Sequence, residues 1–220
     1  MASCSDRPSV ALCVGETNGA SQNTSNENAN GVVAPVDPTQ LDDFLLKSLG
    51  EPSKKERPPL EAAKPFIKWA GGKTQLLEPI STLLPARIQT YYEPFIGGGA
   101  VFWALATAKR FARAVINDWN QEIVDTYLVV RDFTDDLVPL LARLKQEYIE
   151  APEATFMRER AKDPTTLAPL HRAARFLFLN RTGFNGMYRV NKKGQFNVPW
   201  GKYENPKILD EPLLRACSQA

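Results

Sequence analysis

The chain has 220 residues, enough for one or two domains, and its hydrophobic fraction of 43% is sufficient for a buried core. The formal net charge of +2 is close to neutral, so overall composition does not indicate nucleic-acid binding. Cys4, Cys13, Cys217 and the single His171 offer neither a disulfide framework nor metal-ligand spacing, which predicts no metal site and a reducing compartment. Because no apolar run could span a bilayer and no signal peptide is evident, we expect a cytoplasmic protein that does not bind membranes.

Residues 1–63 are predicted to form a disordered, low-complexity tail and linker. The segment 1–38 is rich in Ser, Asn, Thr and Gly and has few large apolar residues, so it cannot offset its ordering entropy. Residues 39–50 have the spacing of one amphipathic helix, which is either a docking peptide or a transient helix in the tail. A polar, proline-closed stretch follows, and we expect the folded region to begin near Lys64.

From Lys64 onward, apolar residues alternate between helical and strand spacing, which is typical of an α/β protein. The predicted elements are, in chain order, an extended segment at 66–69, a helix at 74–84, a strand at 91–95, a helix at 100–111, a strand at 114–117, helices at 121–131, 135–150 and 171–180, and two short strands at 187–190 and 195–198. Thr134 is a candidate N-cap for the helix 135–150, although Pro139 favours a start nearer Val138.

The most informative stretch runs from Tyr91 to Asp118. It predicts a strand, a glycine turn, a helix and a second strand that ends in a carboxylate, a unit that often holds a nucleoside. Asp118 lies 21 positions after Gly97, close to the spacing of about 20 expected for an acid that binds ribose hydroxyls. Phe102 replaces the third small residue of the dinucleotide fingerprint, which favours a nucleoside without pyrophosphate. The alternatives are a tight turn without a ligand and, for Asp118, a helix N-cap, although Asn120 suits that role equally well.

The sequence KWAGGK at 68–73 is a second candidate for ligand binding. Gly71 and Gly72 remove side chains where a ligand approaches, and Lys73 falls at a helix start that already favours anions such as a carboxylate. The ring of Trp69 offers a π face to a sulfonium cation. The alternative interpretation is that Trp69 is a core residue and Lys73 is solvated.

A basic segment follows between Arg181 and Lys202, with five Lys and Arg residues and no Asp or Glu. Aromatic and Asn side chains are interleaved with the cations, and Gly194 suits the turn of a hairpin. Cations bind phosphates, aromatic rings stack on bases, and amides read adenine edges, so the segment has the chemistry of a nucleic-acid contact. A solvated basic loop is the alternative.

Together, the segments PFIKWAGGKTQLLEPI, EPFIGGGAVF with IND, and FLNRTGFNGMYRVNKKGQFNVPWGKYENP closely resemble the Dam-like (D12 class) DNA adenine-N6 methyltransferases. The resemblance covers residue 65 to the C-terminus. It implies an S-adenosylmethionine-dependent methyltransferase (Rossmann-like) fold with a helical and β-hairpin DNA-recognition insertion. It also implies that S-adenosyl-L-methionine binds at Trp69, Lys73, Phe95, Gly97, Gly99 and Asp118. Contacts to double-stranded DNA are expected from Arg181, Asn185, Tyr188, Arg189, Lys192 and Lys193.

These segments divide the chain into three predicted regions: the tail and linker (1–63), a partial cofactor-binding α/β core (64–133), and a helical/β-hairpin target-recognition region (134–220). Glu93, in the cofactor loop, either takes a second ribose hydroxyl or anchors its strand. The function expected from the resemblance is site-specific methyl transfer to adenine N6 in DNA, as in restriction-modification systems.

The resemblance also implies a catalytic Asp-Pro-Pro-Tyr tetrapeptide, which accepts the hydrogens of the adenine amine and stacks on the flipped base. The sequence does not contain it, since its only Pro-Pro pair, Pro58-Pro59, follows Arg57. We therefore assign no catalytic residue and expect a fold that is incomplete at the C-terminus and inactive alone. The alternatives are a DNA- and cofactor-binding module without turnover, one half of a split enzyme completed by a second chain, and an unrelated nucleotide-binding enzyme.

Overall fold

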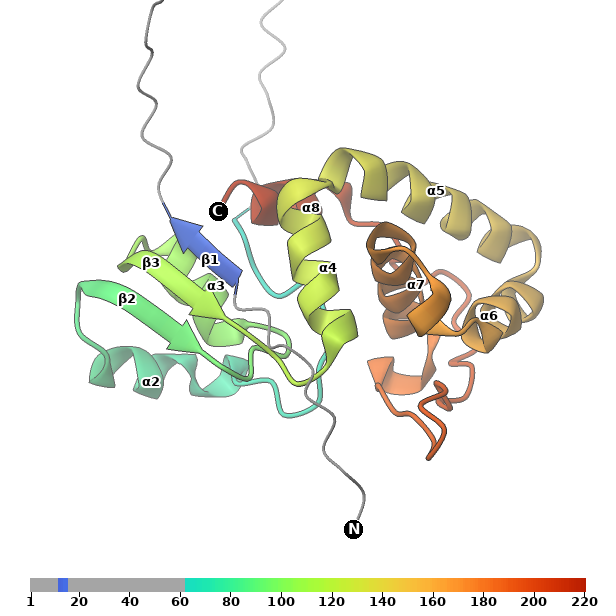
Figure 1. Ribbon diagram of the computed structural model, residues 1–220, viewed down its shortest axis with the longest axis horizontal. Coiled ribbons are helices and arrows are strands. Elements are labelled where there is room, and N and C mark those ends of the chain that lie inside the picture. Colours follow the sequence, from blue (N-terminus) through green and yellow to red (C-terminus); the bar gives the residue numbers. More distant parts are fainter. Residues whose placement is uncertain (1–11, 16–61) are drawn as a thin grey trace, which may run out of the picture. The chain divides into compact units, whose positions relative to one another are not determined.

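The computed structural model describes residues 12–15 and 62–220 (Figure 1). The amphipathic helix predicted at 39–50 and the linker after it lie outside the described residues. Strand β1, Leu12–Gly15, lies inside the segment predicted to be a tail, and its backbone pairs with the sheet described below.

The described sheet has three strands in the order β1-β3-β2. Strand β2, Ile88–Glu93, runs parallel to β3, Phe111–Ile116, and β1 is antiparallel to β3. Helix α3, Ala100–Thr107, connects the two parallel strands, as a βαβ unit requires. Since Glu93 pairs with Ile116, the carboxyl ends of β2 and β3 meet at one edge of the sheet.

Helix α3 ends at Thr107, whereas the sequence predicted a helix that extends to Phe111. The backbone N–H of Arg110 donates to the carbonyl of Leu105 (3.0 Å) and that of Lys109 to Ala106 (2.9 Å), the pairing of a Schellman motif. Lys109 takes the left-handed conformation with φ +50°. The early stop lets β3 begin at Phe111, three residues before the predicted strand.

Helices make up most of the remaining described chain. They are η1 (Thr74–Leu76), α2 (Leu77–Leu83), α4 (Gln121–Asp132), α5 (Thr134–Glu150), α6 (Pro152–Ala161), η2 (Pro164–Thr166), α7 (Pro169–Thr182), η3 (Phe184–Gly186) and α8 (Glu211–Ser218). Helices α6 and α8 were not predicted from the sequence. Among the described helices, none is long and apolar enough to cross a membrane.

Strand β2 spans Ile88–Glu93 instead of the predicted 91–95, and two further local predictions were also wrong. Helix α5 begins at Thr134 and contains Pro139, so Thr134 does not cap it; its hydroxyl instead donates to the carbonyl of Val130. The two short strands predicted at 187–190 and 195–198 are reduced to one isolated bridge, Val190–Phe196. A second isolated bridge, Gly183–Trp200, lies outside the predicted strands.

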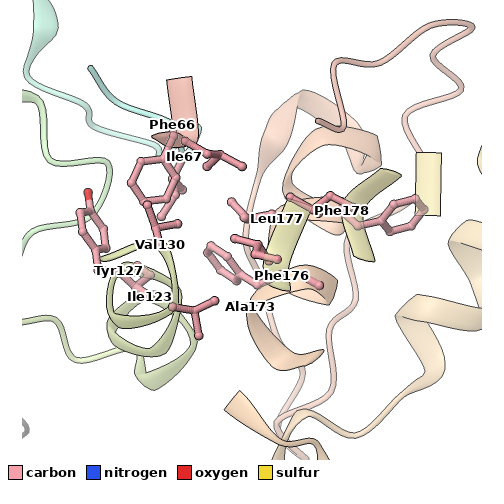
Figure 2. Close-up of a cluster of buried hydrophobic side chains, with 14 of the residues drawn as sticks. Phe66, Ile67, Ile123, Tyr127, Val130, Ala173, Phe176, Leu177 and Phe178 are labelled. Carbon is pink, nitrogen blue, oxygen red and sulfur yellow. The ribbon is translucent and has the colours of Figure 1, made fainter. Parts of the chain in front are cut away.

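The core joins the regions on both sides of residue 133. Helix α4 presents Ile123, Tyr127 and Val130 at helical spacing to α7, which presents Ala173 and Phe176 (Figure 2). Phe66 and Ile67 pack on the same cluster and are almost completely buried (Figure 2). The segment just before KWAGGK is therefore held against α4, which places it beside the carboxyl ends of the strands.

Candidate functional site

A cavity of about 300 Å³ lies at the carboxyl ends of β2 and β3, where open parallel sheets usually bind ligands. We call it the glycine-loop cavity. The six residues predicted to bind the cofactor all line it: Trp69, Lys73, Phe95, Gly97, Gly99 and Asp118. Residues from three separate sequence segments thus meet around one space.

Asp118 holds the glycine turn against the end of β3. Its Oδ2 accepts from the backbone N–H of Gly97 (2.9 Å), and its Oδ1 accepts from that of Asn120 (2.9 Å). Asn120 is the N-cap of α4, because its side chain accepts from the N–H of Glu122 (3.0 Å). Asp118 is therefore not the helix cap, and each of its oxygens keeps a lone pair for a ligand hydroxyl.

Gly97 is close to two aromatic side chains. It has φ +48°, and a Cβ at this position would lie 2.6 Å from Cδ1 of Trp69. The hydroxyl of Tyr127 donates to the carbonyl of Gly97 (3.3 Å). Only glycine fits beside these neighbours with this backbone conformation.

Lys73 and Glu93 place opposite charges at the cavity. Lys73 is exposed and lies one residue before η1, so it precedes the first helical turn instead of falling within it. Burial raises the pKa of Glu93, while the hydroxyl of Tyr91 (2.9 Å) and the charge of Lys73 act in the opposite direction.

Asn180 was not among the site residues predicted from the sequence. Asn180 is buried and pairs both ways with the backbone of Lys68, accepting from its N–H (2.9 Å) and donating to its carbonyl (2.7 Å). It also donates to the carbonyl of Gly186 (3.1 Å), so it ties KWAGGK to the basic segment.

Residues 187–198, which we call the recognition hairpin, present several predicted DNA contacts to solvent. Lys192 and Lys193 are exposed at its tip, where the side chain of Asn191 accepts from the N–H of Lys193 (2.9 Å). Arg189 is exposed, and its Nε donates to the side chain of Asn197 (2.7 Å). Three cations are thus displayed within five residues.

The other predicted DNA contacts differ in their exposure. Asn185, just before the hairpin, is exposed and has φ +55°. Arg181 is partly buried and donates to the carbonyl of Phe66 (2.6 Å), although it also lines a cavity of about 340 Å³. Tyr188 is partly buried, and its hydroxyl donates to Glu122 (2.6 Å), so it faces the protein interior. No described residues form a cluster of three or more His, Cys, Asp or Glu side chains that could hold a metal ion.

Comparison with known proteins identifies one matching family and several similar methyltransferases. Residues 69–220 match the model of the D12 class N6 adenine-specific DNA methyltransferase family. Two type II methyltransferases, M.MjaIII of Methanocaldococcus jannaschii and M1.LlaDCHI of Lactococcus lactis subsp. cremoris, are each 42% identical, over 168 and 160 residues. The DNA adenine methylase of Escherichia coli K12 is 36% identical over 155 residues.

The matches cover much of this chain and a smaller share of the relatives. They include 71%, 71% and 70% of this chain, but 58%, 54% and 54% of M.MjaIII, M1.LlaDCHI and the Escherichia coli methylase. The chain therefore spans little more than half the length of these relatives.

Proposed function

The chain belongs to the D12 class of N6 adenine-specific DNA methyltransferases, and we propose on this basis that it binds S-adenosyl-L-methionine in the glycine-loop cavity and double-stranded DNA at the recognition hairpin, for methyl transfer to adenine N6. The observation that carries the proposal is the convergence of all six predicted cofactor residues on one cavity.

The residues around the cavity fit the cofactor chemically. A cavity of about 300 Å³ is large enough for a small-molecule ligand. The ammonium of Lys73 suits the cofactor carboxylate, the oxygens of Asp118 suit ribose hydroxyls, and the ring of Trp69 suits the sulfonium. When bound, the cofactor supplies an electrophilic methyl group.

Lys73→Ala should weaken S-adenosyl-L-methionine binding by about 1.5–3 kcal/mol, because it removes a charge-assisted contact. The affinity should thus fall roughly 10- to 150-fold in calorimetry, with little change in melting temperature because Lys73 is exposed. Asp118→Ala should lower both affinity and melting temperature, because it also releases the N–H groups of Gly97 and Asn120. Lys145→Ala, which removes an exposed charge on α5, is the matched control. Wild-type affinity in both the Lys73 and Asp118 variants would rule out this pocket.

The recognition hairpin suits the sugar–phosphate backbone of DNA. Lys192 and Lys193 project from a turn that is closed by the side chain of Asn191, so the two charges stand at a defined place. Arg189 and Asn185 are exposed and carry the donors that read base edges. Arg181, from the end of α7, adds a cation at a neighbouring cavity.

Replacing Lys192 and Lys193 with Ala should reduce binding to all DNA sequences alike. Each lost phosphate contact should lower the slope of log affinity against log salt by about 0.9. Fluorescence anisotropy over a salt series measures this slope. The control is the double variant Arg143→Ala, Lys145→Ala. It also removes two positive charges, but from α5, and it should leave the salt slope unchanged. A full wild-type slope in the hairpin variant would contradict DNA binding by the hairpin tip.

The acceptors for the hydrogens of adenine N6 are not assigned to residues 1–220, because the sequence contains no Asp-Pro-Pro-Tyr. We therefore propose that residues 1–220 bind and position the cofactor and the DNA. Titration with S-adenosylhomocysteine and with adenine-containing duplex DNA tests it directly. Absence of binding to both ligands by the folded protein would overturn it.

A further inference from the structure

Tyr188 of the recognition hairpin packs against the wall of the glycine-loop cavity. Its ring centroid lies 5.7 Å from that of Trp69, which lines the cavity, and 5.7 Å from that of Phe176 on α7. Phe196, on the other arm of the hairpin, lies 5.8 Å away. The ring therefore fills the space between the hairpin, α7 and KWAGGK.

The hydroxyl of Tyr188 makes a second connection, to the start of α4. It donates to Oε1 of Glu122 (2.6 Å), whose Oε2 accepts from the buried guanidinium of Arg175 (3.0 Å). Both oxygens of a nearly buried carboxylate are thus occupied, which fixes the position of the tyrosine hydroxyl.

The start of α4 leads directly to the cavity. Glu122 donates its backbone N–H to Asn120, whose own N–H donates to Asp118, and Asp118 accepts from the loop residue Gly97. Tyr188 consequently contacts the cavity through Trp69 on one side and through the Glu122–Asp118 segment on the other.

Tyr188 is also fixed to the part of the hairpin that faces solvent. The adjacent residue, Arg189, accepts from the backbone N–H of Asn197 (2.9 Å) and donates from its guanidinium to the same residue. Tyr188 and the exposed Arg189 are therefore adjacent on an arm that is bonded across the hairpin to Asn197.

We propose that Tyr188 is a positioning residue that couples DNA binding at the recognition hairpin to cofactor binding in the glycine-loop cavity. This inference rests on the proposed function, since it needs both ligands to bind at these places. Thermodynamic linkage requires the effect to be reciprocal: DNA strengthens cofactor binding by the same factor by which cofactor strengthens DNA binding.

The test measures the affinity of the full chain for S-adenosylhomocysteine with and without saturating duplex DNA. We expect the wild-type affinity to rise about fivefold or more with DNA, at the lower end of typical coupling. We call the affinity with DNA divided by the affinity without DNA the coupling ratio. Tyr188→Phe, which removes only the hydroxyl, should reduce the coupling ratio, and Tyr188→Leu should bring it close to one. Tyr148→Phe is the matched control. It also removes a buried hydroxyl, which donates to the carbonyl of Tyr203 (2.7 Å), and it should keep the wild-type ratio.

The coupling ratio separates positioning from a merely structural role, because a general loss of stability lowers the melting temperature without changing the ratio. A wild-type ratio of one, or a wild-type ratio in both folded Tyr188 variants, would overturn the inference while leaving the proposed function intact. Failure of the wild-type protein to bind either ligand would instead refute the proposed function on which the inference depends.

Discussion

Replacing Arg175 with Met should lower the free energy of unfolding by about 3–5 kcal/mol, because it leaves one member of a buried ion pair without its partner. Arg175 is only 1% exposed and donates to Oε2 of Glu122 (3.0 Å) and to the carbonyl of Glu159 (2.9 Å). These bonds connect α7 to α4 and α6. Urea unfolding monitored by circular dichroism measures the change.

Two controls test this explanation. Arg143→Met removes a cation from a surface pair with Glu147 (3.4 Å), where Arg143 is 66% exposed, and should cost less than about 1 kcal/mol. The double variant Arg175→Met, Glu122→Met should recover part of the loss, because no unpaired charge is left buried. A loss below about 1 kcal/mol for Arg175→Met would show that the buried pair does not hold the helices together.

Gly97→Ala should reduce S-adenosyl-L-methionine affinity by one to two orders of magnitude. The new Cβ would lie 2.6 Å from Trp69, so either the ring or the loop must move, and both line the glycine-loop cavity. The positive φ of +48° adds strain of roughly 1–3 kcal/mol for a non-glycine residue. Isothermal calorimetry gives the affinity, and scanning calorimetry gives the accompanying loss of stability.

Gly194→Ala is the matched control for backbone strain. Gly194 has φ +76° in the hairpin turn, but nothing lies within 4 Å of its added Cβ. It should therefore lower stability without changing cofactor affinity. Equal losses of affinity in the two variants would show that the contact between Gly97 and Trp69 is unimportant for the cavity.

Local patterns in the sequence predicted the strand–loop–helix–strand unit around Gly97 and Asp118. Alternating apolar residues, a glycine turn and a helical repeat lie close together in the chain, so each is readable without knowledge of its partners. The early end of α3 was not readable, because Lys109 occupies a left-handed position that usually carries glycine. The family expected from the resemblance is confirmed by the match of residues 69–220 to the model of the D12 class.

The sequence by itself determined which residues form the glycine loop, the KWAGGK segment and the basic turn, because these features depend on near neighbours. Only the tertiary structure decided how they meet. Asn180 pairs with the backbone of Lys68 across 112 positions, and no local periodicity records such a partner. The inward direction of Tyr188, beside the outward Arg189, likewise depends on Trp69 and Glu122. Contacts between distant segments are set by packing and by the pairing of buried polar groups, which emerge only when the chain is folded.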